Sequence, residues 1–145
     1  MKHVMASVIL LCAAFQAASA QGVSLVDSYM EYFRKGDLET KIQVVEDSKD
    51  IESENFGPLY HEVIVWILGN LALIKSDPMV GQIISISINK IEEIPYPPAR
   101  HSLLKLFQVQ DDSSFRVNIL KALAVVSKGD KRIVDGLNTY LNNQN

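Results

Sequence analysis

Two stretches of the sequence, 35 residues apart, carry the same helical spacing of apolar residues, and this internal repeat constrains the fold more than any other feature. The apolar pattern of 80–91 recurs at 115–126, and the pattern of 99–107 recurs 34 residues later at 133–141. A period in this range is typical of stacked helix pairs, because a single pair cannot cover its own apolar face. The matching positions are Val80, Ile84, Ile88 and Ile91 with Phe115, Ile119, Leu123 and Val126, and Ala99, Leu103 and Phe107 with Ile133, Leu137 and Leu141.

The stretch 112–141 shows the predicted unit most clearly, as two antiparallel helices joined by a tight turn. The first apolar stripe ends at Val126, Gly129 supplies a stop, and Asp130 restarts the chain. The second stripe consists of Ile133, Val134, Leu137 and Leu141.

Capping residues and helix breakers divide the rest of the chain into further helices. Asp37 is a good N-cap, and Pro58 suits the first turn of the next helix, whose apolar positions cover much of its circumference from Leu59 to Leu71. Such a helix is expected in the middle of a fold. Pro95–Pro98 is predicted to be a non-helical connector.

The segment 83–88 alternates β-branched residues with serines and on propensity alone favours a strand. We predict a helix instead, because Asp77 and Pro78 form a strong helix start and the apolar stripe continues to Ile91.

The sequence resembles the HEAT-like helical repeats, including the short variants related to phycobilisome-lyase repeats. The resemblance covers 37–141 and rests on Phe115-Arg116-Val117, Ile119-Leu120 and Ala122-Leu123, with departures at Asn118, Lys121 and Gly81. It implies an all-α fold, a right-handed α-solenoid of about three antiparallel helix pairs whose concave face binds protein or peptide. The expected units are 37–73, 77–109 and 112–141, with an N-terminal capping helix within 22–36. Tetratricopeptide repeats have a similar period, but their Trp-Leu-Gly-Tyr-Ala-Phe-Pro pattern does not occur here.

The N-terminal residues 1–20 have the pattern of a secretory signal peptide. Lys2 and His3 precede an apolar run, and Ala18-Ser19-Ala20 fits the cleavage rule. We therefore expect an exported protein, periplasmic or secreted, with a single domain at 21–145. Acylation at Cys12, as in a lipoprotein, is disfavoured by Leu11 before it, and cleavage after residue 20 removes the chain's one cysteine.

The charge balance limits the class of partner. The chain has 14 Lys and Arg residues against 17 Asp and Glu residues and no basic run. We therefore expect no nucleic-acid partner, and membrane contact only through the transient signal peptide.

The acidic stretch Glu46–Asn55 has two interpretations. It is expected to be a solvated loop or frayed helix end, as charge runs usually are. The alternative, a cation site, lacks the alternating oxygen ligands and central glycine of a calcium loop.

No catalytic motif is visible in the sequence. His61-Glu62 begins a zinc-protease motif, but position 65 is Val65 rather than histidine, and no third ligand accompanies His61 and His101. Nucleophile elbows, phosphate loops and dinucleotide fingerprints are absent from the sequence. We expect no enzyme, cofactor or metal, although a triad assembled from distant residues stays open.

The sequence therefore predicts a non-enzymatic protein-binding or scaffold module of the bacterial cell envelope, either monomeric or part of a hetero-complex. The alternatives are an accessory subunit permanently docked in an envelope complex and, less favoured, a small hydrolase. The candidate protein-binding residues are Tyr96, expected to be exposed between prolines, Arg100 and Arg116. The alternative for Arg116 is a packing role between neighbouring repeats.

Overall fold

The computed structural model describes residues 24–142, and every regular element within that range is a helix, which confirms the all-α prediction. No helix in this range is both long enough and apolar enough to cross a membrane. The predicted signal peptide, residues 1–20, lies outside the described residues, as does Cys12. The elements are α2 (Leu25–Lys35), α3 (Leu38–Ser48), α4 (Gly57–Leu68), α5 (Ala72–Ser76), α6 (Pro78–Glu93), the 3-10 turn η1 (Pro97–Ala99), α7 (Arg100–Val109), α8 (Ser113–Val126) and α9 (Lys131–Asn142).

Aspartate side chains cap the starts of four helices, and the sequence predicted three of these starts, at Asp37, Asp77 and Asp130. Asp37 accepts a hydrogen bond from the Thr40 amide at 2.9 Å, and Asp112 accepts one from the Phe115 amide at 2.8 Å. Asp77 and Asp130 make equivalent bonds at the starts of α6 and α9. Each cap satisfies a backbone donor that the first turn leaves unpaired, so these residues fix where the helices begin.

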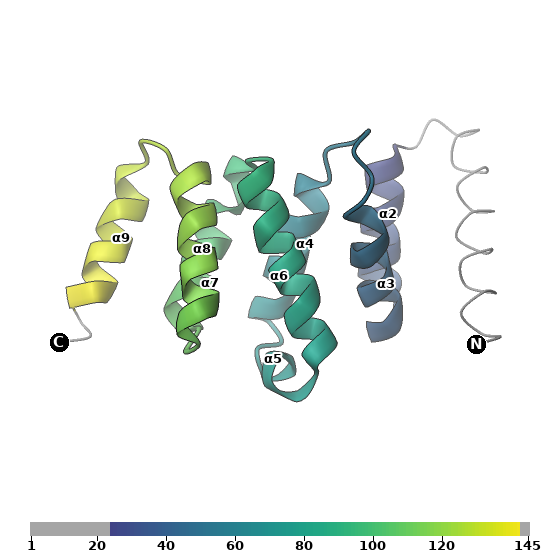
Figure 1. The fold of residues 1–145 in the computed structure, drawn as a ribbon, viewed down its shortest axis with the longest axis horizontal. Helices are drawn as coiled ribbons and strands as arrows, with labels where there is room; N and C mark the ends of the chain where they lie inside the picture. Colours follow the sequence, from purple (N-terminus) through teal and green to yellow (C-terminus); the bar gives the residue numbers. More distant parts are fainter. Residues whose placement is uncertain (1–23, 143–145) are drawn as a thin grey trace.

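The helices form two rows. The first row is α2, α4, α7 and α9, in which each helix contacts the next, and the second row is α3, α6 and α8. Contacts between the rows pair α2 with α3, α4 with α6 and α7 with α8 (Figure 1). The connections 49–56, 94–99 and 127–130 lie together at the top of Figure 1, which we call the upper end, whereas 69–77 and 110–112 lie at the lower end.

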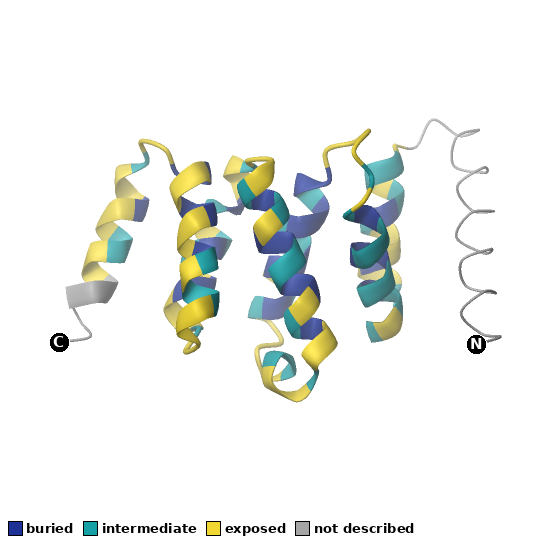
Figure 2. Cartoon of the chain, viewed as in Figure 1, coloured by how far each residue is buried: buried dark blue, intermediate teal, exposed yellow. Residues whose placement is uncertain are grey.

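The core lies between the rows, where the buried positions face one another (Figure 2). Helix α4 buries apolar side chains around much of its circumference and contacts α2, α6 and α7, which confirms the prediction of a central helix. Ile83, Ile84 and Ile88 are fully buried within α6, so the helix prediction for the β-branched segment is also confirmed.

Three details of the sequence prediction are wrong. Leu71 lies beyond the end of α4 and is 36% exposed, because Gly69 ends that helix. Val134 is 53% exposed, whereas its neighbour Ile133 is buried, because within residues 24–142 the main packing partner of α9 is α7. The proline connector is not wholly non-helical, because Pro97 and Pro98 open a 3-10 turn.

The end of α2 is held by a buried lysine that the sequence pattern did not reveal. The Lys41 ammonium group donates hydrogen bonds to the carbonyl oxygens of Phe33 at 2.5 Å and Gly36 at 2.7 Å. It also lies 5.1 Å from the centre of the Phe33 ring. A positive charge at the carboxyl end of a helix satisfies otherwise unpaired carbonyls and complements the helix dipole.

Candidate functional site

The upper end carries a pocket of about 310 Å³ between the 49–56 connection, the start of α4 and the end of α6. Its floor is apolar and aromatic, while its rim carries charges of both signs. Such a combination of an apolar floor and a few polar groups is typical of a ligand site. The lining residues are Lys49, Ile51, Glu52, Glu54, Asn55, Phe56, Gly57, Tyr60, Lys90, Glu93 and Ile94.

The rim of the pocket has an excess of negative charge that is free to meet a ligand. Both lysines already have a carboxylate partner, because Lys49 pairs with Glu46 at 2.5 Å and Lys90 pairs with Glu93 at 2.8 Å. The carboxylates of Glu52 and Glu54 are exposed, and within residues 24–142 neither has an ion-pair or hydrogen-bond partner. A cationic group on a ligand would therefore find two unpaired carboxylates here.

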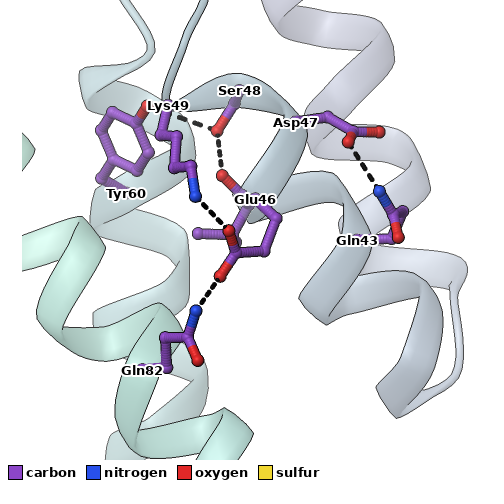
Figure 3. Close-up of polar contacts among 8 residues, drawn as sticks. Gln43, Glu46, Asp47, Ser48, Lys49, Tyr60 and Gln82 are labelled. Carbon is purple, nitrogen blue, oxygen red and sulfur yellow. Dashed lines mark hydrogen bonds and ion pairs between the residues drawn. The ribbon is translucent and has the colours of Figure 1, made fainter.

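A network of polar contacts fixes the helix end from which the pocket loop departs (Figure 3). Glu46 on α3 accepts a hydrogen bond from Gln82 on α6 at 2.6 Å, in addition to its ion pair with Lys49. The hydroxyls of Ser48 and Tyr60 lie 3.3 Å apart, and burial raises the pKa of Tyr60. The prediction of a solvated loop or frayed helix end is therefore only partly right, since Glu46 and Ser48, in the last turn of α3, contact neighbouring helices.

Aromatic rings pack beneath and beside the pocket. Phe56 is buried, and its ring centre lies 5.0 Å from that of Tyr29 on α2. Asn55 accepts a hydrogen bond from the Gly57 amide at 2.8 Å, which fixes the turn into α4. These contacts give the floor of the pocket a defined shape in the absence of a ligand.

Tyr96 is half-buried, so the expectation that it is exposed is wrong. Its ring lies over Gly57, where an added methyl group would come within 2.8 Å of the ring carbons. The ring centre is also 5.9 Å from that of His61. Tyr96 therefore covers the start of α4 next to the pocket and presents only part of its ring to solvent.

His61 forms a contact that resembles part of a catalytic pair. Its Nε2 lies 3.0 Å from the hydroxyl of Ser102 on α7, and burial lowers the pKa of its imidazole. Its neighbour Glu62 is engaged elsewhere, because its carboxylate pairs with Arg34 at 2.9 Å. Within residues 24–142, no group of three or more histidine, cysteine, aspartate or glutamate residues is placed to hold a metal ion.

The three residues predicted to bind a partner do not form one surface. Arg100 pairs with Asp130 at 3.3 Å, near the upper end, and so joins α7 to the start of α9. The guanidinium carbon of Arg116 lies 4.5 Å from the centre of the Phe107 ring. Because Phe107 is seven residues after Arg100 on α7, Arg116 lies about 10 Å further along that helix. The contact with Phe107 supports the packing interpretation of Arg116.

The pocket itself was not predicted from the sequence. Its floor consists of Phe56 and Tyr60, which read as ordinary core positions, and its rim comes from two segments about 40 residues apart, 49–57 and 90–94. The acidic stretch supplied the one visible signal, since Glu52 and Glu54 belong to it.

In comparisons with known proteins, no protein-family model, curated protein or solved structure matches the chain.

Proposed function

We propose that this chain is a non-enzymatic protein-binding or scaffold module, built as a right-handed HEAT-like α-solenoid and exported to the bacterial cell envelope. The architectural part is supported by the two rows of helices and by connections that alternate between the upper and lower ends. The export part is supported by the sequence pattern of residues 1–20.

The pocket at the upper end is the observation that carries the binding proposal. Its volume of about 310 Å³ suits one or two side chains of a peptide rather than a whole folded domain. The floor, with Phe56 and Tyr60, favours an apolar or aromatic side chain, and the unpaired carboxylates of Glu52 and Glu54 favour an adjacent lysine or arginine. We therefore propose a partner segment in which a basic residue neighbours an apolar one.

Selection from a displayed library of random peptides, with the full chain as bait, tests this proposal. Enriched peptides are expected to combine lysine or arginine with an aromatic or aliphatic residue. Their affinity is then measured for the wild-type chain and for the rim variant E52K/E54K. Reversing two rim charges is expected to weaken binding on the order of tenfold, since each exposed pair contributes up to about 1 kcal/mol.

The matched control is E39K/D135K, which makes the same charge change at two exposed positions outside the pocket lining. This control is expected to keep the wild-type affinity within about twofold. Equal losses in both variants would show that only the overall charge of the chain matters. Enrichment of peptides without basic residues would contradict the assignment of the rim.

The exposed apolar side chains near the C-terminal end favour the alternative of an accessory subunit docked in a larger complex. Leu120 on α8 is 38% exposed and Val134 on α9 is 53% exposed. The two functions differ in how the chain is recovered, because a docked subunit co-purifies with its complex in stable proportion, whereas a binding module is released by competing peptide.

A further inference from the structure

The charges of the chain are sorted along the direction in which the helices stack. The segment 24–55, which contains α2 and α3, has nine acidic and four basic residues. The segment 113–142, which contains α8 and α9, has five basic and two acidic residues. The two ends of the array therefore have opposite charge, although the whole chain is only mildly negative.

Internal pairing strengthens this polarity. At the N-terminal end all four basic residues are engaged, because Lys41 binds backbone carbonyls and the other three pair with carboxylates. At the C-terminal end Asp130 is engaged by Arg100 and Arg132, whereas Lys128 and Lys131 are exposed and have no partner within the described residues. The unpaired charge of the N-terminal end is therefore negative, whereas that of the C-terminal end is mainly positive, with Asp135 as its one exposed carboxylate.

Among the described helices, each row also ends in a helix that packs against its row on one side only. Within the first row, α7 contacts α9 through Arg100, which pairs with Asp130, and through Leu104, which packs against Gly136. The residues 34 positions later on α9 are Val134 and Asn138, and both are exposed. They are placed to contact a next helix of the row, and Lys131 lies one turn before Val134 on the same face.

The opposite end presents a complementary flank. On α3, Glu46 points towards Gln82 of α6, whereas Gln43 and Asp47 lie on the side of the helix away from Gln82 (Figure 3). On α2, the ring of Tyr32 is 37% exposed. This flank therefore offers an aromatic ring and a carboxylate where the C-terminal flank offers apolar side chains and ammonium groups.

We propose that the N-terminal flank of a second copy of this chain docks on the C-terminal flank of the first, so that α2 continues the first row after α9 and α3 continues the second row after α8. Like charges would face each other in a head-to-head pair of either end, so opposite ends are favoured. A head-to-tail contact of this kind does not close on itself in a dimer and leads to longer oligomers. The inference does not depend on the pocket or on its ligand.

Sedimentation of the full chain over a range of concentrations tests the proposal. At about 0.02 M salt the average mass is expected to rise with concentration past that of a dimer, and at about 0.5 M salt it is expected to return towards the monomer because the charges are screened. The end variant K128E/K131E is expected to associate at least tenfold more weakly. The control K75E/K105E makes the same charge change on other exposed lysines and is expected to associate like the wild type.

Mixing two variants separates end-to-end docking from a general effect of charge. E39K/D47K removes most of the negative charge of the N-terminal flank, so this variant alone is also expected to associate at least tenfold more weakly than the wild type. In an equal mixture with K128E/K131E, the unaltered C-terminal flank of the first variant meets the unaltered N-terminal flank of the second, so the mixture is expected to associate into a dimer. The proposal is overturned if the wild type stays monomeric at low salt, if its mass stops at the dimer, if the control weakens association equally, or if the mixture fails to associate. Circular dichroism of each variant checks that its helices are intact.

Discussion

Replacing Lys41 with methionine is expected to destabilise the fold strongly, because this lysine holds the end of α2 from inside the protein. The side chain is only 9% exposed, and its ammonium group donates to the carbonyl oxygens of Phe33 and Gly36. Methionine has a similar length and fills the same space, but it cannot donate a hydrogen bond. The substitution therefore isolates the polar contribution from the packing contribution.

The expected loss is about 2 to 4 kcal/mol. A hydrogen bond from a charged donor contributes roughly 1.5 to 3 kcal/mol. Loss of the Lys41 ammonium group leaves the buried carbonyl oxygen of Phe33 without this donor. Removing a buried charge offsets part of this loss, since its desolvation cost also disappears. For a fold of this size, 3 kcal/mol corresponds to a decrease in melting temperature of about 10 °C.

Urea unfolding followed by circular dichroism measures the change, and Lys35→Met is the matched control. Lys35 lies in the same last turn of α2, but its side chain is 75% exposed and its partner is Glu31 in the same helix. Exposed pairs of this kind contribute little, so the control is expected to unfold near the wild-type midpoint. A loss below about 1 kcal/mol for Lys41→Met would refute the reasoning, because it would mean that water replaces the lysine at these carbonyls without cost.

Four further outcomes are expected. Gly81→Ala is expected to stabilise the fold by about 0.5 to 1 kcal/mol in urea unfolding, since Gly81 lies inside α6 and nothing lies within 4 Å of the added methyl group; a loss of stability would contradict this. Gly57→Ala is expected to lower the free energy of unfolding by about 1 to 3 kcal/mol in the same assay, because the methyl group would come within 2.8 Å of the Tyr96 ring. An unchanged midpoint would show that the ring moves aside easily. Burial lowers the pKa of His61 in the fold, so the unfolded chain binds the proton more readily. The free energy of unfolding is therefore expected to fall as pH drops from about 7 towards the lowered pKa. His61→Gln is expected to flatten this pH dependence, and an equally steep decline in the variant would assign the dependence to other groups. Ser102→Ala is expected to leave the hydrolysis of p-nitrophenyl acetate unchanged, and a loss of hydrolysis relative to wild type would make the contact between Ser102 and His61 catalytic.

Helix positions were predictable because their signals are local. Asp37, Asp77 and Asp112 form caps within three residues of their own position, and the stripe from Val80 to Ile91 repeats at the helical period. Such signals need no knowledge of the neighbouring helices. They were strong enough to override the strand propensity of 83–88, and the burial of Ile83, Ile84 and Ile88 agrees with that choice.

The candidate site was predictable only in part. The acidic stretch was visible in the sequence, but its connection to the end of α6 was not, because Glu46 and Gln82 are 36 residues apart. Tyr96 was recognisable as an unusual aromatic residue between prolines, yet its half-buried position depends on Gly57 of another element. A property that depends on two distant segments leaves no local periodicity to detect.

The sequence by itself determined the compositional class, the helices and most of their buried faces, since local caps and apolar periodicity specify these directly. Only the tertiary structure decided which helices became neighbours. That choice buried Lys41 against the end of α2, paired Arg100 with Asp130 and left Val134 exposed on α9, the last described helix of its row. The physical reason is that an apolar stripe specifies burial without specifying the partner, whereas pockets, ion pairs and open flanks exist only once the partners are in place.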